Sequence, residues 1–395
     1  MRVLYLTHRL PYAPNRGDRI RAFHLLEGLR QAFEVEVVSL VHDDQEASHA
    51  SDVAARGMRV STAPVAGVSR WLRAPLALPG TEPLTHVLLD APAIDALLRR
   101  VVAARRPSVV VAFCSGMAKF ALREPLAQIP YVLDMVDVDS QKWQQLGEVA
   151  RPPKRWVYRR EARVLSAFET HATERAVTTL VINEKERAVL SAMAPTADVR
   201  VLPNGVDVDD FRPTGQAPPS RTVVFCGVMN YAPNEAGASW LVTKVWPSVV
   251  ARHPDAQLEI VGSEPSVAVR ALATPGVTVT GKVPHTRDYL WRAAVSVAPL
   301  HTARGLQNKV LEALAAGVPV VTTTAVREGL PDGIGRGCTV ADAADQFAAS
   351  IVRLLDMSPD ERRSLASSVD LSGLSWHGPR AQMIDVVRSA AGIHV

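Results

Sequence analysis

Cysteine is scarce in this 395-residue chain, and its placement excludes two kinds of site. The three cysteines are Cys114, Cys226 and Cys338, and no two of them form a CxxC pair. An odd number of widely spaced cysteines does not make a disulfide framework, and structural zinc sites normally use closely spaced ligand pairs. The sequence therefore predicts neither a disulfide-stapled fold nor a zinc centre.

Long apolar runs and a strong charge of one sign are also missing. No apolar stretch approaches the roughly 18 residues that span a bilayer, and only five apolar residues precede His8, too few for a signal peptide. Lys and Arg number 44 against 40 Asp and Glu, a difference too small to indicate nucleic-acid binding. We therefore expect a cytoplasmic protein with no nucleic-acid partner.

The residues that are present describe an α/β protein. Hydrophobic residues make up 47% of the chain and charged residues 21%, which are globular values. Short β-branched runs alternate with helical patterns from end to end, which predicts parallel sheets covered on both faces. The expected strands are 3–7, 35–41, 109–113, 131–134, 178–182, 199–202, 222–226, 257–261, 277–280, 295–299, 318–323 and 338–340.

Twelve strands are many for one doubly wound sheet, and a break divides them. Asn204-Gly205 is a turn signal, and the Pro-rich stretch 213–220 precedes a fresh strand. We therefore expect two Rossmann-like domains, at residues 1–203 and 204–373, followed by a helix over 374–395. Ligands of such sheets bind at strand carboxyl ends and between domains, which places the expected chemistry in a cleft.

The most informative segment is APLHTARGLQNKVLEALAAGVPVV at residues 298–321. A strand ends at Pro299, a polar loop follows, and a helix is expected from Gln307. Backbone N–H groups at that helix start, with Lys309 in the first turn, would attract an anion. Glu312 lies one turn further on, where a carboxylate could accept two ribose hydroxyls. The alternative is an ordinary helix with a solvated Lys/Glu face, which the i, i+3 pair also supports.

Several residues of the first domain follow predicted strands in the same way. In the loop at 10–18, Gly17 would let the backbone approach a phosphate, and Arg16 and Arg19 carry positive charge. Ser115 follows the strand at 109–113. Asp134, Asp137 and Asp139 resemble a metal-binding DxD pattern, but Asp134 closes a predicted strand, which disfavours a metal site. Each of these residues could also be an ordinary loop or cap residue.

The order of motifs resembles glycosyltransferase family 4, the retaining nucleotide-sugar transferases of the GT-B fold. The similar segments are EALAAGVPVV at 312–321, VLPNGVD at 201–207, TGKV at 280–283 and LSW at 374–376, the last at the start of a helix that crosses back onto the first domain. Segments 305–312, 137–143 and 15–18 are similar to the exosortase-associated transferases of bacterial exopolysaccharide clusters. The resemblance implies two Rossmann-like domains that face a cleft.

The resemblance also implies a role for each donor-side residue. The nucleotide base would meet the backbone of Lys282 and Val283, and the ribose would meet Glu312. The diphosphate would lie against the first domain's Gly17, against Gly227, and along the loop and helix start formed by Gly305, Leu306, Gln307, Asn308 and Lys309. No metal or other cofactor is implied.

The sequence departs from the family pattern at two points. The family's first glutamate, which helps to hold the donor sugar, would fall at position 304, where this chain has Arg304. Many members also carry an arginine and a lysine after the strand that precedes Gly227, and Lys309 would take over that role. A diphosphate in a closed site needs a cation, so we expect Arg304 and Lys309 to stabilise the leaving group.

The acceptor side of the resemblance lies in the first domain. Ser115 and Asp137 would contact the acceptor or the donor sugar, and we expect the acceptor to be a glycan or a polyprenyl-linked glycan. The segment Arg151–Arg163 has six basic residues interleaved with Trp156 and Tyr158, which is typical of a helix on an anionic membrane surface. A solvated helix that packs Trp156, Val164 and Phe168 into the core is the alternative.

Taken together, the sequence predicts a retaining glycosyltransferase of exopolysaccharide or cell-surface glycan synthesis, cytoplasmic or peripheral on the inner face of the membrane. A nucleotide-sugar 2-epimerase of the same fold would bind the same donor without transferring its sugar. A non-catalytic two-domain sugar-binding protein would also bind its ligand between domains, but such proteins are usually exported.

Overall fold

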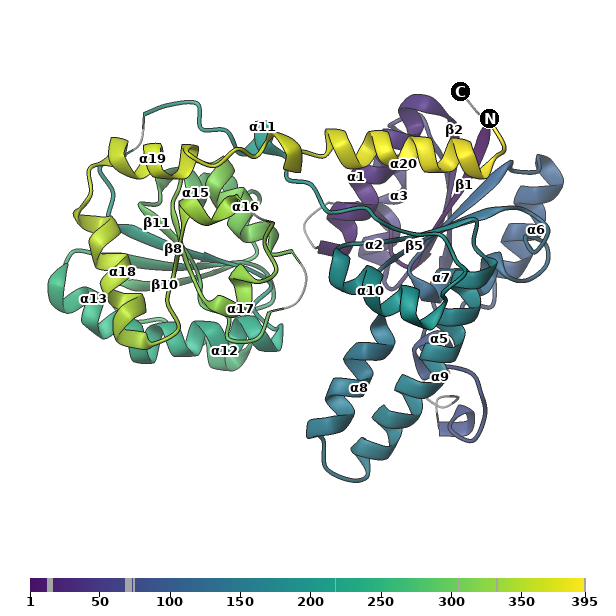
Figure 1. The fold of residues 1–395 in the computed structure, drawn as a ribbon, viewed down its shortest axis with the longest axis horizontal. Helices are drawn as coiled ribbons and strands as arrows, with labels where there is room; N and C mark the ends of the chain where they lie inside the picture. Colours follow the sequence, from purple (N-terminus) through teal and green to yellow (C-terminus); the bar gives the residue numbers. More distant parts are fainter. Residues whose placement is uncertain are drawn as a thin grey trace. The chain divides into compact units, whose positions relative to one another are not determined.

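The computed structural model divides into two compact units, shown in Figure 1. Unit 1 comprises Met1–Pro203 and His377–Val395, and unit 2 comprises Asn204–Trp376. The structure describes residues 1–12, 17–67, 73, 75–216, 218–303, 306–331 and 333–393. Each unit is a parallel sheet flanked by helices, so the fold is α/β with two Rossmann-like domains.

Unit 1 contains a seven-stranded sheet in the order β3-β2-β1-β4-β5-β6-β7. Its strands are β1 Arg2–Thr7, β2 Glu34–Val41, β3 Arg59–Pro64, β4 Val109–Phe113, β5 Tyr131–Val136, β6 Thr178–Val181 and β7 Val199–Val201. Every pairing is parallel. β1 and β4 are buried along their whole length, as expected of parallel strands covered on both faces.

The described helices of unit 1 cover this sheet and extend beyond it (Figure 1). They are α1 Gly17–Ala32, α2 Asp44–Ser48, α3 Ala50–Ala54, α5 Leu84–Leu88, α6 Ile94–Ala104, α7 Ser115–Ala121, α8 Asp139–Val149, α9 Lys154–Arg175, α10 Glu184–Met193 and α20 His377–Ala390. α20 packs on α1, where Arg380 Nε donates to the backbone oxygen of His24 (3.1 Å).

Unit 2 repeats the strand order of unit 1 with one strand fewer, β10-β9-β8-β11-β12-β13. Its strands are β8 Thr222–Cys226, β9 Gln257–Val261, β10 Val277–Gly281, β11 Val295–Ala298, β12 Val320–Thr322 and β13 Cys338–Val340. Its helices are α11 Val208–Phe211, α12 Ala232–Trp240, η1 Leu241–Val245, α13 Trp246–Arg252, α14 Val267–Arg270, α15 Arg287–Arg292, α16 Asn308–Ala315, α17 Thr324–Arg327, η2 Ile334–Gly337, α18 Ala344–Asp356, α19 Pro359–Ser367 and η3 Ser372–Leu374.

Three local expectations need correction. β3 was not expected, because its sequence RVSTAP is polar and only one of its residues is buried. The residues 235–252 have a helical pattern that predicts one continuous helix, but the structure has a π-helical turn, η1, between α12 and α13. The C-terminal helix begins at His377 and not at 374, because Val206 N donates to Leu374 O (2.8 Å) and keeps 374–376 in unit 2.

The helix α9 is the longest described helix of unit 1 at 22 residues, and it is rich in charge. It packs against α8 to form a hairpin that projects from the sheet (Figure 1). In the part of the chain that the structure describes, none of the helices combines the length and the apolar character that crossing a membrane requires.

Candidate functional site

The strand order of unit 2 singles out the carboxyl ends of β8 and β11. These central strands are neighbours, and the chain continues from them toward opposite edges of the sheet. Ligands of doubly wound sheets bind at such a switch point. β8 ends at Cys226 and is followed by Gly227, whereas the chain that leaves β11 enters α16, which carries Lys309 and Glu312. Two expected donor-side segments therefore lie at one edge of one sheet.

A lysine–asparagine pair occupies this edge. Lys309 Nζ donates to Asn234 Oδ1 (2.8 Å) and lies 4.9 Å from the centroid of the Phe225 ring. Asn234 is buried near the start of α12, and its Nδ2 donates to the backbone oxygen of Val228 (2.9 Å). Because both ends of the amide are bonded, its oxygen is held toward the lysine. Among the described residues no carboxylate forms an ion pair with Lys309, which leaves its charge available to an anionic ligand.

Glycines make room for this pair. A Cβ on Gly227 would lie 2.8 Å from Asn234 Nδ2 and 3.2 Å from Lys309 Nζ, so any side chain there would displace the pair. Gly262, at the end of β9, has φ +147°, and a Cβ there would lie 1.7 Å from the backbone oxygen of Gly227. Only glycine fits at this second position. The two strand ends can therefore approach each other closely beside Lys309.

The electrostatics of Lys309 and Glu312 follow from their half-buried positions. Burial lowers the pKa of Lys309 to about 8, against the opposing influence of Cys226 and Glu312. Burial raises the pKa of Glu312 to about 7, and the nearby Lys309 opposes this shift. Near neutral pH the lysine is thus mostly a cation, while the carboxyl can both donate and accept hydrogen bonds.

The start of α16 contributes further polar groups. Asn308 is the first residue of this helix, and its Oδ1 is buried with no hydrogen-bond partner among the described residues. Gln307 immediately precedes the helix, and the half-buried Leu306 packs against the core of unit 2. Backbone N–H groups at a helix start attract anions. Arg304 and Gly305, which complete the expected donor loop, lie outside the described residues.

The residues expected to meet the nucleotide base lie at the end of the edge strand β10. This strand ends at Gly281, which has φ +73°, and the chain continues into Lys282 and Val283. Lys282 is exposed, whereas Val283 packs against the core of unit 2. They share the carboxyl edge of the sheet with Gly227, from which two strand positions separate them.

The corresponding edge of unit 1 holds the residues expected on the acceptor side. Ser115 is buried at the start of α7, directly after β4 and Cys114. Asp137 directly follows the end of the neighbouring β5. Cys114 and Val136 both have positive φ, 68° and 67°, which is rare outside glycine and often marks functional backbone. The structure therefore places Ser115 and Asp137 at the ends of two adjacent strands of one sheet.

The pKa of the Asp137 carboxyl is raised although the residue is exposed. Crowding by surrounding protein atoms, followed by the negative charges of Glu186 and Asp139, raises its pKa to about 6. A carboxyl group of this kind can hydrogen-bond a sugar hydroxyl as an acceptor, and it gains or loses a proton near neutral pH.

The neighbouring Asp134 is already engaged by an arginine that the sequence did not single out. Arg21 of α1 is fully buried and donates to both carboxylate oxygens of Asp134, with bonds of 2.7–3.2 Å. Arg21 also donates to the backbone oxygen of Leu202 (2.8 Å). Asp134 therefore has a structural partner. Across the described ranges, no group of three or more His, Cys, Asp and Glu side chains could hold a metal ion.

The loop after β1 is tied to a second buried carboxylate. Glu46 accepts from the backbone N–H of Leu10 (3.1 Å) and of His42 (2.9 Å), and Arg19 donates to it (3.0 Å). Arg19 is thereby committed within unit 1. Gly17 is the first residue of α1, while Asn15 and Arg16 lie outside the described residues.

Sequence reasoning identified Gly227, Lys309 and Glu312, which the structure brings together in unit 2. It missed Asn234 and Phe225. The pair Pro233-Asn234 in the first turn of α12 was the one available signal for Asn234, since an asparagine that becomes buried at a helix start needs partners for its amide. No signal indicated that its partner would be Lys309, 75 positions away.

Family models match most of the chain. Residues 17–205 match the glycosyl transferase 4-like domain, and residues 220–357 match glycosyl transferases group 1. A GDP-mannose-dependent alpha-(1-6)-phosphatidylinositol monomannoside mannosyltransferase of Mycobacterium tuberculosis is 30% identical over 318 residues, which cover 73% of this chain and 76% of that protein. The chain belongs to glycosyltransferase family 4. This glycosyltransferase is accordingly an enzyme of the hexosyltransferase type.

Other relatives and solved structures agree with this assignment. A GDP-mannose-dependent monoacylated alpha-(1-6)-phosphatidylinositol monomannoside mannosyltransferase of Corynebacterium glutamicum is 31% identical over 50% of this chain and 57% of its own length. The sucrose-phosphate synthase of Thermosynechococcus elongatus has a TM-score of 0.73 at 18% identity and full coverage of both chains. Anabaena HepE, solved with UDP, has a TM-score of 0.67 at 12% identity, with 98% of this chain and 100% of that one covered. These structures establish the GT-B fold for the glycosyltransferase.

Proposed function

We propose that this glycosyltransferase moves a sugar from a nucleotide-diphosphate sugar to a glycan or lipid-linked acceptor, with retention of anomeric configuration. The observation that carries the proposal is the Lys309 ammonium at the switch point of unit 2, held by Asn234 and lacking a carboxylate partner among the described residues. A diphosphate is the anionic part of such a donor, and it requires a cation in a partly buried site.

The donor would lie along unit 2. Glu312 accepts the ribose hydroxyls, and the backbone at Lys282 and Val283 meets the base. The diphosphate occupies the space beside Gly227 and the start of α16, from Gly305 through Leu306, Gln307 and Asn308, where Lys309 neutralises it. Gly17 of unit 1 contributes backbone to the phosphates. No metal or other cofactor is required in this scheme.

Catalysis in this proposal depends on stabilising the leaving group. As the bond between sugar and diphosphate breaks, negative charge grows on the diphosphate, and Lys309 and Arg304 stabilise it together with the N–H groups of α16. Asp137 orients a hydroxyl of the sugar, and Ser115 lies on the acceptor side. A strong protein base is not required, because the leaving diphosphate can itself take up the proton of the acceptor hydroxyl.

The acceptor in this proposal is anchored in a membrane. The names of the mycobacterial and corynebacterial relatives describe phosphatidylinositol mannosides as their acceptors, which supports a lipid-linked acceptor here. The motifs at 15–18, 137–143 and 305–312 are similar to exosortase-associated transferases, so we assign the product to exopolysaccharide or cell-surface glycan synthesis and the carrier to a polyprenyl. The basic segment Arg151–Arg163 would hold the enzyme on the inner face of an anionic membrane.

A panel of nucleotide sugars tests the donor class. The enzyme is incubated with UDP-, GDP- and ADP-sugars, and the melting temperature and the slow release of free sugar are measured. We expect one base to raise the melting temperature and to give slow hydrolysis with the anomeric configuration retained. A protein that no nucleotide sugar stabilises would contradict the transferase assignment, and release of an epimerised sugar would favour a 2-epimerase of the same fold.

A matched pair of ligands tests the ribose assignment. Wild-type enzyme should bind the nucleoside diphosphate of the preferred base more tightly than its 2′,3′-dideoxy analogue, because Glu312 accepts the two hydroxyls. Loss of a charge-assisted hydrogen bond costs about 1.5–3 kcal/mol. The Glu312→Ala variant should bind both ligands equally. A variant that still discriminates between them would remove Glu312 from the ribose site.

A further inference from the structure

Helices α8 and α9 form a hairpin whose tip, residues 149–156, lies at the far end from the sheet (Figure 1). The helices are joined by packing of Trp143 against Tyr158, with ring centroids 5.4 Å apart. Gly147 permits their close approach, since a Cβ there would lie 3.0 Å from Arg159 Cγ. The hairpin is thus a built element with defined contacts, and its outer surfaces can be assigned residue by residue.

Large apolar side chains are exposed at the tip and in the last turn of α8 before it. Val149 is 81% exposed, Trp156 67% and Leu146 38%. The alternative that Trp156 packs into the core is wrong, whereas Phe168, three turns further along α9, does pack, with its ring 4.3 Å from that of His86. Exposed tryptophan flanked by cations is the pattern of side chains that lie at a membrane–water interface.

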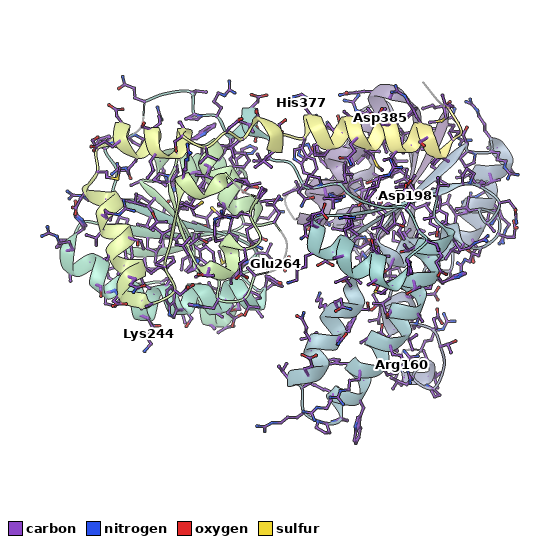
Figure 2. The ribbon with its side chains drawn as sticks, viewed as in Figure 1. Arg160, Asp198, Lys244, Glu264, His377 and Asp385 are labelled. Atoms are coloured by element: carbon purple, nitrogen blue, oxygen red, sulfur yellow. The ribbon has the colours of Figure 1, made fainter. Side chains whose placement is uncertain are left out.

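The six basic residues of Arg151–Arg163 differ in whether they bond to other protein groups. Arg160 donates to backbone oxygens of the 77–82 segment, and Glu161 is buried and accepts from the N–H groups of Leu84 and Thr85. Figure 2 labels Arg160 on α9. Arg155 donates to Ala150 O. The remaining cations form no ion pair within the described ranges: Arg151, Lys154, Arg159 and Arg163.

Two of these cations line an open groove between the helices. The groove has a volume of about 380 Å³ and is lined by Gln141, Gln144 and Glu148 of α8 and by Arg159, Arg163 and Ser166 of α9. Arg159 and Arg163 are one helical turn apart, so both guanidinium groups can reach the same ligand. Guanidinium groups bind phosphate oxygens through N–H bonds, and glutamine and serine side chains add neutral donors. The carboxylate of Glu148 in the same lining opposes an anion, and the two arginines outnumber it.

We propose that the α8–α9 hairpin docks on an anionic bilayer, with its apolar tip in the interfacial layer and a lipid phosphate held in the groove by Arg159 and Arg163. The hairpin carries both groups that such a surface requires. Its apolar tip fits the boundary of the hydrocarbon layer, and its unpaired cations fit the layer of phosphate headgroups. The proposal rests on the proposed function, because it specifies how the basic segment Arg151–Arg163 would hold the enzyme on an anionic membrane.

Flotation of the full-length enzyme with vesicles tests the proposal. Three compositions are used: phosphatidylcholine alone, phosphatidylcholine with phosphatidic acid, and phosphatidylcholine with oleate at matched surface charge. Wild type should bind the phosphatidic acid vesicles best, the oleate vesicles less and phosphatidylcholine least. Trp156→Ala should weaken binding to both anionic vesicles. Brominated lipids should quench tryptophan fluorescence in wild type and not in Trp156→Phe.

The groove is tested with a pair of double variants. Arg159→Ala/Arg163→Ala should remove the preference for phosphatidic acid over oleate and should reduce binding by about 25-fold, at roughly five-fold for each cation. Arg99→Ala/Arg100→Ala removes the same charge from exposed positions of α6 and should leave the preference unchanged. Equal behaviour of the two variants, or equal binding of wild type to both anionic vesicles, would overturn the headgroup site. Absence of vesicle binding would overturn the docking surface as a whole.

Stabilisation by nucleotide sugars separates this proposal from the donor assignment. All of these variants should keep the rise in melting temperature that the preferred nucleotide sugar gives to wild type. Vesicle binding without such a rise would contradict the donor assignment and leave the hairpin proposal standing. A rise in melting temperature without vesicle binding would have the reverse consequence.

Discussion

The two sheets share one strand order, yet their carboxyl edges use positive charge in opposite ways. In unit 1, Arg21 is buried against Asp134 and Arg19 is bound to Glu46, so the cations stabilise the fold. In unit 2, Lys309 is held by an amide and an aromatic ring, and no carboxylate neutralises it among the described residues. Doubly wound sheets bind ligands at this edge, and the charge of Lys309 supports our proposal that unit 2 receives the anion.

The backbone at the two edges differs as well. Unit 1 turns its chain with Cys114 and Val136 at positive φ, where side chains are retained. Unit 2 places Gly227 and Gly262 in contact, with no room for a side chain at either. The edge of unit 1 therefore presents side chains such as that of Asp137, whereas the edge of unit 2 presents backbone beside Lys309. This difference suits a sugar or acceptor in one unit and a diphosphate in the other.

Replacing Arg21 by leucine should have the largest effect on stability. Removal of one partner of a buried ion pair leaves Asp134 uncompensated, and we expect the free energy of unfolding to fall by about 3–5 kcal/mol. Arg30→Leu on the same helix removes an exposed arginine whose partner Glu27 keeps a second arginine, Arg56, and should cost less than about 1 kcal/mol. Chemical denaturation measures both. Equal losses would show that unit 1 does not depend on its buried cation.

The pH dependence of donor binding should follow Lys309. Its pKa of about 8 means that the ammonium loses its proton as the pH rises through 8. Only the protonated form attracts the diphosphate, so affinity should be fully present only well below pH 8 and should fall by up to about ten-fold per pH unit above it. Calorimetric titration between pH 7 and 10 measures this. Lys309→Arg, which does not titrate, should abolish the decline, and a wild-type profile that stays flat would contradict the assignment.

Asn234 should have a smaller effect, through the position of Lys309. Asn234→Ala removes one hydrogen bond to the ammonium, and we expect donor affinity to fall about five- to ten-fold, near 1 kcal/mol. Asn234→Asp should weaken binding further, since a carboxylate would neutralise the lysine, and should move the decline in affinity to higher pH. Asn230→Ala, at an exposed position bonded to Glu264, is the control (Figure 2 labels Glu264). An Asn234→Asp profile identical to wild type would contradict this role.

The sequence predicts the fold more completely than the site, for physical reasons. The expected strands in both units are continuous apolar runs, which parallel sheets require, and their parallel pairing follows from alternation with helices. The strand β3 could not be predicted in this way because it is a polar strand at the edge of its sheet. The sequence did not indicate the roles of Arg21 and Asn234. Each is a polar helix residue that bonds to a residue far away in the chain, and neither periodicity nor a local motif encodes such a pairing. The proximity of Lys309 and Glu312 could be predicted from the sequence because residues three positions apart in a helix lie on the same face.

We propose that unit 2 holds the donor through Lys309, whereas the polar residues of unit 1 act on the sugar and acceptor. Titration calorimetry with the nucleoside diphosphate of the preferred base tests it in wild type, Lys309→Ala and Asp137→Asn. We predict that Lys309→Ala weakens binding about 100-fold, near 2.7 kcal/mol, and that Asp137→Asn stays within about two-fold of wild type. Unchanged affinity in Lys309→Ala, or a large loss in Asp137→Asn alone, would contradict the account.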